Sequence, residues 1–160
     1  MAGRRHAHTV VHQRNTRFLA MPYKPTNFDR IDPASRPIYG RDGWYRLEES
    51  ISYDVGFPNS GDRITVPVGF ETDYASVPRA FWSIVAPRGA HEAAALIHDY
   101  LYKYNLRTRK EADRIYIEGL TVLNVPVWKC QLMHKAVRVW GWVPWRKGLK
   151  KKRRAAKSGK

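Results

Sequence analysis

The spacing of apolar residues changes once along this 160-residue chain, and the change divides the fold into two halves. In residues 51–55, Ile51, Tyr53 and Val55 alternate with polar residues, which is the period of a half-buried strand. From about residue 90 onward, apolar residues recur every three or four positions, as they do on one face of a helix. The sequence therefore predicts strands first and helices afterwards, which is an α+β fold.

Short extended segments make up the first half. Residues 44–47 and 51–55 are rich in aromatic and β-branched side chains, and the turn-forming residues 56–61 separate them from another such run at 63–67. Because a turn joins the two runs, we expect 51–55 and 63–67 to pair antiparallel. With a further extended piece at 69–70, the result is a small antiparallel sheet of three or four strands.

The second half is predicted to contain three helices. The first covers residues 90–104, and the second begins at Thr108, whose capping box with Glu111 satisfies free backbone N–H groups. The third begins near Pro126, which is tolerated in a first turn. The side chains expected to be buried are Ala94, Ile97, Leu101, Tyr104, Ala112, Ile115, Tyr116, Leu120, Trp128, Leu132, Ala136 and Trp140, with Met133 and Val137 as alternatives on the third helix.

The positive charge lies at the two ends of the chain. Of the 29 Lys and Arg residues, thirteen fall in residues 1–20 and 146–160, which contain no acid, so sixteen bases face fourteen acids between them. We predict a flexible basic arm at 1–20, a proline-rich extended strap at 21–43, one α+β domain at 44–145, and a basic tail at 146–160 without regular structure.

Two groups at the C-terminal end are candidates for binding partners. A run of bases is typical of a segment that binds nucleic acid or an acidic protein surface through charge. Exposed tryptophans are typical of protein contacts. The candidates are Lys150, Lys151, Lys152, Arg153 and Arg154 for nucleic acid, and Trp142 and Trp145 for a partner protein, whereas Trp140 is expected in the core.

Four chemically active residues flank the most apolar part of the chain. Asp73 and Arg79 precede it, and His98 and Asp99 follow it on the first predicted helix. Because buried charges are costly unless they are paired, we expect these four side chains to share one polar network where sheet and helices meet. The network is either structural or catalytic, and a metal site formed by His91, His98 and Asp73 or Asp99 is a further alternative.

Other residues are predicted to have structural roles only. Arg109 and Asp113 lie one helical turn apart and suit an intrahelical ion pair. Cys130 is the single cysteine, so it forms no intramolecular disulfide and is expected to be a small buried apolar side chain. No apolar run approaches the roughly 18 residues of a membrane span, and no cofactor is predicted.

Four segments together resemble a known family. Residues 66–79, 98–102, 109–114 and 136–141 are similar to successive signatures of an uncharacterised family of tailed-phage and prophage proteins, domain of unknown function thirteen-fifty-three. The resemblance covers about residues 44–142. It implies a phage context and supplies no catalytic residues, because none is established for the family.

Two functions are compatible with these features. The first is a non-enzymatic phage virion or assembly protein, which docks on other phage structural proteins and contacts DNA or acidic surfaces through its basic arms, in the virion or the host cytoplasm. The alternative is a small hydrolase, with or without a metal ion. In it, Asp73 and Asp99 are ligands or general bases, His98 is an acid–base group or ligand, and Arg79 binds an anion.

Overall fold

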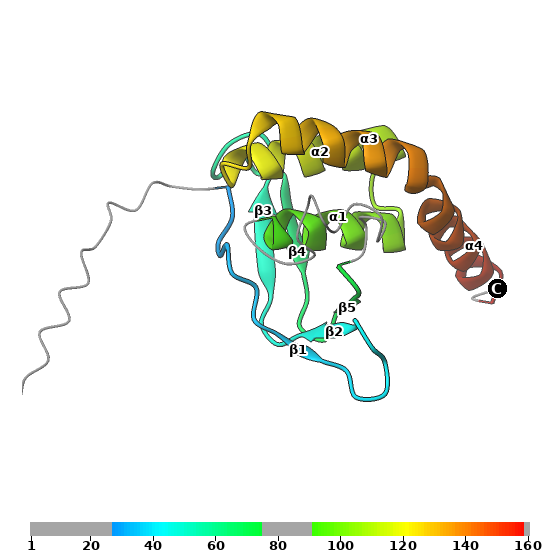
Figure 1. The fold of residues 1–160 in the computed structure, drawn as a ribbon. Coiled ribbons are helices and arrows are strands. Elements are labelled where there is room, and N and C mark those ends of the chain that lie inside the picture. Colours follow the sequence, from blue (N-terminus) through cyan, green and yellow to red (C-terminus); the bar gives the residue numbers. More distant parts are fainter. Residues whose placement is uncertain (1–26, 75–90, 159–160) are drawn as a thin grey trace, which may run out of the picture.

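Strands precede helices in the computed structural model, which describes residues 27–74 and 91–158 (Figure 1). These residues form five strands and four helices, so the predicted α+β class is confirmed. The elements are β1 (Ser35–Pro37), β2 (Tyr45–Leu47), β3 (Ile51–Asp54), β4 (Arg63–Val66), β5 (Glu71–Thr72), α1 (Glu92–Tyr104), α2 (Arg109–Val122), α3 (Val127–Trp140) and α4 (Trp142–Ser158).

The strands form two small antiparallel sheets instead of one. β3 and β4 pair as the predicted hairpin, in which Ile51 lies opposite Val66 and Tyr53 lies opposite Ile64. The second sheet has the order β1-β2-β5, and its edge strand β1 comes from the proline-rich strap. The strap thus contributes to a sheet, while the arm at 1–20 and the strap as far as residue 26 lie outside the described residues.

Strand β3 is buried on both faces, although its alternating sequence predicted half-burial. Two polar side chains are buried there. The hydroxyl of Ser52 lies 3.0 Å from that of Thr65 on the neighbouring strand, within hydrogen-bond distance. The carboxylate of Asp54 accepts a hydrogen bond of 2.9 Å from the backbone N–H of Asn59 in the turn. Both polar side chains are therefore satisfied locally, which removes most of the cost of burying them.

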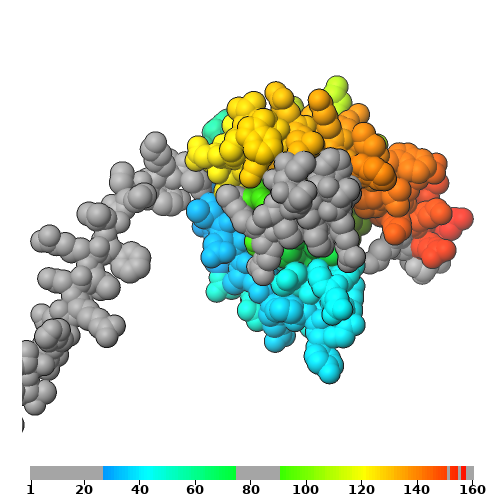
Figure 2. All heavy atoms as spheres, in the orientation of Figure 1, coloured from blue at the N-terminus to red at the C-terminus, as the bar shows by residue number. Residues whose placement is uncertain are grey.

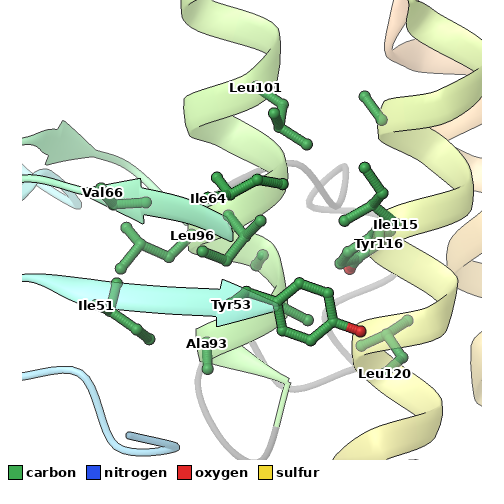
Figure 3. Close-up of a cluster of buried hydrophobic side chains, with 14 of the residues drawn as sticks. Ile51, Tyr53, Ile64, Val66, Ala93, Leu96, Leu101, Ile115, Tyr116 and Leu120 are labelled. Atoms are coloured by element: carbon green, nitrogen blue, oxygen red, sulfur yellow. The ribbon is translucent and has the colours of Figure 1, made fainter. Parts of the chain in front are cut away.

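The hairpin packs against α1 and α2 to form the main core (Figure 3). Its side chains interleave with those of the two helices, and the Tyr53 ring lies between β3 and α2 with its hydroxyl pointing toward the helix. That hydroxyl donates a hydrogen bond of 2.7 Å to Glu118 on α2. The labelled core residues are Ile51, Tyr53, Ile64, Val66, Ala93, Leu96, Leu101, Ile115, Tyr116 and Leu120.

The predicted helix boundaries are close to those observed. Thr108 and Glu111 form the complete capping box at the start of α2, and Asn105 ends α1 in the left-handed conformation. The buried face of α3 carries the alternative pair, Met133 and Val137. Trp128 and Trp140 were expected to be buried but are each 56% exposed, because the face of α3 turned toward α2 is the one that contains Met133.

The prediction of an unstructured tail was wrong, because residues 146–158 belong to α4. This fourth helix follows α3 after the single residue Gly141 and forms one end of the molecule (Figure 2). The run of bases has no apolar period, but Lys, Arg and Ala are strong helix formers. Trp145 holds the helix against α1, where its ring meets the Tyr102 ring edge-on at a centroid distance of 5.2 Å.

Gly148 lets α4 approach α1 closely. A Cβ atom at this position would lie 2.5 Å from the carbonyl oxygen of Tyr102 and 2.7 Å from Oδ1 of Asn105. One turn farther on, Lys152 donates a hydrogen bond of 3.3 Å to the carbonyl oxygen of Asn105. A cation there also interacts favourably with the negative end of the α1 dipole. Within the described ranges, no helix is both long and apolar enough to cross a membrane.

We predict that Gly148→Ala destabilises the protein, although alanine favours a helix by about 1 kcal/mol over glycine. The added methyl group must push α4 away from α1, and overpacking of this kind typically costs about 1–3 kcal/mol. Thermal unfolding and limited proteolysis of the C-terminal helix measure the effect. Lys150→Ala, at an exposed position of the same helix, is the control and should change stability little. A Gly148→Ala protein as stable as the wild type would contradict the close packing.

Candidate functional site

A buried carboxylate, Asp113 on α2, is the centre of a polar network that joins three helices. Only 1% of Asp113 is exposed. Its Oδ1 lies 3.2 Å from Nε2 of His98 and accepts a hydrogen bond from the Tyr102 hydroxyl. Its Oδ2 accepts a hydrogen bond of 3.0 Å from Nη1 of Arg138, and Nε of Arg109 lies 4.0 Å away. Asp113 thus has partners on α1, α2 and α3.

Helical spacing brings these residues together. His98 and Tyr102 are four residues apart on α1 and therefore lie on the same face, one turn above the other. Arg109 lies four residues before Asp113, as predicted, but it also extends to α3, where it donates hydrogen bonds to the carbonyl oxygens of Val137 and Arg138. The predicted intrahelical ion pair is thus one contact of a larger network.

The network keeps Asp113 ionised. Burial alone would raise the pKa of this carboxyl group, but hydrogen bonds from His98, Tyr102 and Arg138 outweigh that effect, so the pKa lies below its ordinary value of 3.8. Burial and the hydrogen bond to this carboxylate raise the pKa of the Tyr102 hydroxyl, which remains a neutral donor. A carboxylate that is ionised and held by donors on both oxygens is a fixed negative charge.

The ring of His98 is fixed in position and orientation. It lies between two tyrosine rings, with centroids 4.1 Å from Tyr102 and 4.8 Å from Tyr116. Because Asp113 is ionised and can only accept hydrogen bonds, Nε2 of His98 must carry the proton in their contact. In the neutral ring, Nδ1 is then the basic nitrogen. Nδ1 is buried and has no hydrogen-bond partner among the described residues.

A cavity of about 450 Å³ lies beside this ring. Among the described residues, it is lined by the segment around β5, by α1, and by the region where α3 meets α4. Both polar and apolar side chains contribute to the lining. The lining residues are Trp44, Phe70, Glu71, Thr72, Asp73, His98, Asp99, Tyr102, Lys103, Val137, Trp140, Gly141, Pro144, Lys147 and Gly148.

The structure brings together three of the four residues predicted to share a network. Asp73, His98 and Asp99 all border the cavity, while Arg79 lies outside the described residues. The carboxylate that pairs with His98 is Asp113, however, and not Asp73 or Asp99. Asp99 instead accepts a hydrogen bond of 2.7 Å from the Thr72 hydroxyl. Consecutive residues on a helix point about 100° apart, so His98 and Asp99 meet different neighbours.

The predicted metal ligands do not assemble in the described part of the chain. There, no three His, Cys, Asp or Glu side chains form a group that could hold a metal ion. His91 is the N-cap of α1, at the opposite end of the helix from Tyr102. The site that the described residues form is therefore a histidine–carboxylate pair beside a cavity.

Sequence reasoning missed Asp113, Tyr102 and Arg138 as members of the site. Asp113 was assigned only to an ion pair with Arg109. One usable signal was the spacing of four residues between His98 and Tyr102, which places an imidazole and a hydroxyl on one helical face. The position of Asp113 opposite that face depends on how α2 packs on α1, which no local pattern records.

The candidate partner-binding residues differ in exposure. Trp142 is 49% exposed, as predicted, but Trp145 is half-buried against Tyr102 and is part of the packing of α4.

The bases proposed to bind nucleic acid, Lys150, Lys151, Lys152, Arg153 and Arg154, all lie on α4. Lys152 is engaged with α1, whereas Arg153 and Arg154 are exposed. Nucleic-acid binding by these residues stays a prediction.

Comparison with known proteins places the chain in a family. Residues 45–137 match the family described as "Protein of unknown function (DUF1353)". The chain belongs to this family. The DUF1353 match includes His98, Tyr102 and Asp113, and it ends at Val137, one residue before Arg138. Three of the four segments that carried the resemblance, 98–102, 109–114 and 136–141, contribute side chains to the contacts of the buried carboxylate.

A curated relative also matches the chain. The chain is 35% identical over 113 residues to the "Uncharacterized protein y4jT" of Sinorhizobium fredii (strain NBRC 101917 / NGR234). The match covers 69% of this chain and 31% of the relative, so the chain spans less than a third of that protein's length. No solved structure matches the chain.

The lowered pKa of Asp113 predicts how stability changes with pH. The unfolded chain holds a proton on this carboxyl more tightly than the folded protein does, so the contribution of Asp113 is fully present above pH 3.8 and is lost as the pH falls below it. At neutral pH, Asp113→Asn should reduce the free energy of unfolding by about 3–5 kcal/mol, because it removes one partner of a buried charged network.

Urea unfolding between pH 7 and pH 2.5 tests this. The difference between wild type and Asp113→Asn should shrink below about pH 4. Asp42→Asn is the matched control, because Asp42 is exposed and lies outside the network, and its stability should follow the wild type throughout. A difference for Asp113→Asn that is the same at every pH would show that Asp113 is not ionised in the folded protein.

Proposed function

We propose that the protein is a hydrolase in which His98 is the general base that activates a water molecule. One observation carries the proposal: Nε2 of His98 is bound to an ionised carboxylate, while Nδ1 is buried without a partner in the described structure and the residue borders the cavity. An imidazole oriented by a carboxylate is the arrangement that general-base catalysis requires, and catalysis here requires a movement that opens the buried Nδ1 to a water molecule in the cavity.

The proposed reaction transfers one proton through Nδ1 of His98 and replaces the ester C–O bond with a bond to the water oxygen. Nδ1 of His98 accepts a proton from water as the water oxygen bonds to the carbonyl carbon of an ester. The tetrahedral intermediate then collapses, its bond to the alkoxide oxygen breaks, and the alkoxide takes the proton from Nδ1. The products are a carboxylic acid, which releases a proton to solvent, and an alcohol. The imidazole returns to its starting state, so no further reactant is needed.

An acyl ester suits the mixed lining of the cavity. The charged side chains there include two acids, Asp73 and Asp99, and two bases, Lys103 and Lys147, so both signs of charge are present. The carbonyl group of an ester is neutral and needs no particular sign of charge around it. Phe70, Val137 and Trp140 supply apolar surface for the acyl chain.

Asp113 is a positioning residue in this proposal. Its carboxylate holds the proton on Nε2 and stabilises the positive charge that His98 acquires in the transition state. Arg138 and the Tyr102 hydroxyl bind the same carboxylate and keep it ionised, so that it accepts from His98 and does not compete for its proton.

The test measures hydrolysis of neutral chromogenic acyl esters by the full-length chain, with chelator and then with calcium, magnesium, manganese or zinc. Removal of a general base typically costs 10²–10⁴ in rate, so His98→Ala should lower kcat by about that factor. Added imidazole should restore part of the activity, because it can occupy the space of the missing ring. Asp113→Asn should lower kcat and leave KM nearly unchanged, because substrate does not contact Asp113.

Trp128→Ala is the control, since Trp128 is exposed on α3 and does not line the cavity. It should retain the wild-type kcat. Folding of every variant is checked by thermal unfolding, so that a lost fold is not mistaken for lost chemistry. Ester hydrolysis by His98→Ala at the wild-type rate, or no hydrolysis by the wild type under any of the metal conditions, would refute the proposal.

The role as a phage virion or assembly protein, predicted from the sequence, stays a prediction. That prediction was of a non-enzymatic protein, so the hydrolase is its alternative, although location in a particle is compatible with either. Mass spectrometry of purified particles tests it separately from the enzymatic assay.

A further inference from the structure

An exposed apolar patch lies where α3 meets α4. It consists of Val139, Trp140, Trp142 and Val143, which we call the junction patch. Each of these four residues is about half exposed or more. They are contiguous in the chain except for Gly141. A cluster of large apolar side chains at the surface usually marks a place where a protein contacts something other than water.

Helix α4 continues the junction patch with positive charge. Its seventeen residues include eight Lys or Arg and no acidic residue. Arg146 lies over the Trp142 ring, with 4.0 Å between the guanidinium carbon and the ring centroid. Lys150, Arg153 and Arg154 are exposed farther along the helix. Aromatic and basic side chains thus share one continuous surface.

This surface borders the opening of the cavity beside His98. Trp140 belongs both to the junction patch and to the cavity lining. Pro144 and Lys147, in the first two turns of α4, line the cavity as well. A molecule held on the outside of the α3–α4 junction therefore lies next to the cavity.

The combination favours an anionic lipid surface over a nucleic acid. Lipid phosphates and nucleic-acid phosphates would both attract the bases. Binding to nucleic-acid phosphates, however, does not explain why two valines are exposed beside the tryptophans. A membrane interface accommodates both features, because tryptophan and aliphatic side chains enter the headgroup region while Lys and Arg remain with the lipid phosphates. Charge complementarity holds along the whole of α4, which carries no acidic side chain.

We propose that the junction patch and the basic face of α4 dock the protein on anionic phospholipid membranes, and that the ester presented to His98 is an acyl ester of the docked phospholipid. The acyl chain would enter among Phe70, Val137 and Trp140, with the lipid phosphate near Lys147. The substrate assignment rests on the proposed hydrolase, whereas the docking does not.

Sedimentation with vesicles tests docking without any need for activity. The full-length chain is mixed with vesicles of phosphatidylcholine alone or of phosphatidylcholine with phosphatidylglycerol, and the dissociation constant is measured. We expect binding to the anionic vesicles. Lys150→Gln/Arg153→Gln/Arg154→Gln should weaken it by about a hundredfold, since each base near a charged membrane contributes roughly a factor of five.

A matched pair of double variants tests the apolar part. Val139→Ser/Trp142→Ser removes a valine and a tryptophan of the junction patch that do not line the cavity. Val127→Ser/Trp128→Ser removes a valine and a tryptophan of similar exposure from the other end of α3. Because vesicle binding scales with the apolar area inserted, the first pair should weaken binding by about tenfold or more and the second should leave it unchanged.

The outcomes separate docking from catalysis. Release of fatty acid from anionic vesicles should fall in Val139→Ser/Trp142→Ser, while hydrolysis of a short soluble ester stays at the wild-type rate. Soluble-ester hydrolysis without vesicle binding would overturn this inference and leave the hydrolase intact. Vesicle binding with the expected variant pattern, but no hydrolysis of either substrate, would support docking and refute the substrate assignment.

Double-stranded DNA serves as the competing polyanion. If the charge variant loses DNA and vesicle binding equally, and Val139→Ser/Trp142→Ser loses neither, the surface binds any polyanion through charge alone. That result would overturn membrane docking and favour the nucleic-acid role first predicted for the basic residues of α4.

Discussion

The arrangement of the helices depends on one buried negative charge. Asp113 is almost fully inaccessible, and an unpaired carboxylate in that position would be strongly unfavourable. It is tolerated because His98, Tyr102 and Arg138, from two other helices, direct donors at it. The same contacts that satisfy the charge therefore fix how α1, α2 and α3 pack, and they leave the imidazole in one orientation. Fold and candidate chemistry share a single set of hydrogen bonds.

The apolar core positions this network but does not determine its chemistry. The β3–β4 hairpin packs on α1 and α2 and holds the two helices side by side, as Figure 3 shows for Tyr53, Leu96 and Ile115. The β1-β2-β5 sheet contributes Thr72, which borders the cavity and binds Asp99. The β3–β4 sheet thus packs against α1, which carries His98, while the β1-β2-β5 sheet supplies part of the cavity lining.

The sequence predicted the features that depend on near neighbours. Thr108 capped α2 as expected, because a capping box is contained within four residues. The pairing of 51–55 with 63–67 followed from the turn between them. The partner of His98 was missed, because Asp113 is distant in the chain and meets it only through the packing of two helices. Helix α4 was missed because its run of bases has no apolar period, and its close packing on α1 at Gly148 joins segments that are distant in the chain.

Tyr102 contacts both the buried Asp113 network and the outer helix α4. Its hydroxyl binds Asp113, its ring meets Trp145, and its carbonyl oxygen lies where α4 approaches at Gly148. A single side chain and its backbone thus contact both the buried carboxylate and the outer helix. A ligand that shifts α4 and thereby changes the free energy of the Asp113 network is coupled to that network, and thermodynamic reciprocity then requires a molecule bound beside His98 to change the affinity of α4 for its ligand by the same factor.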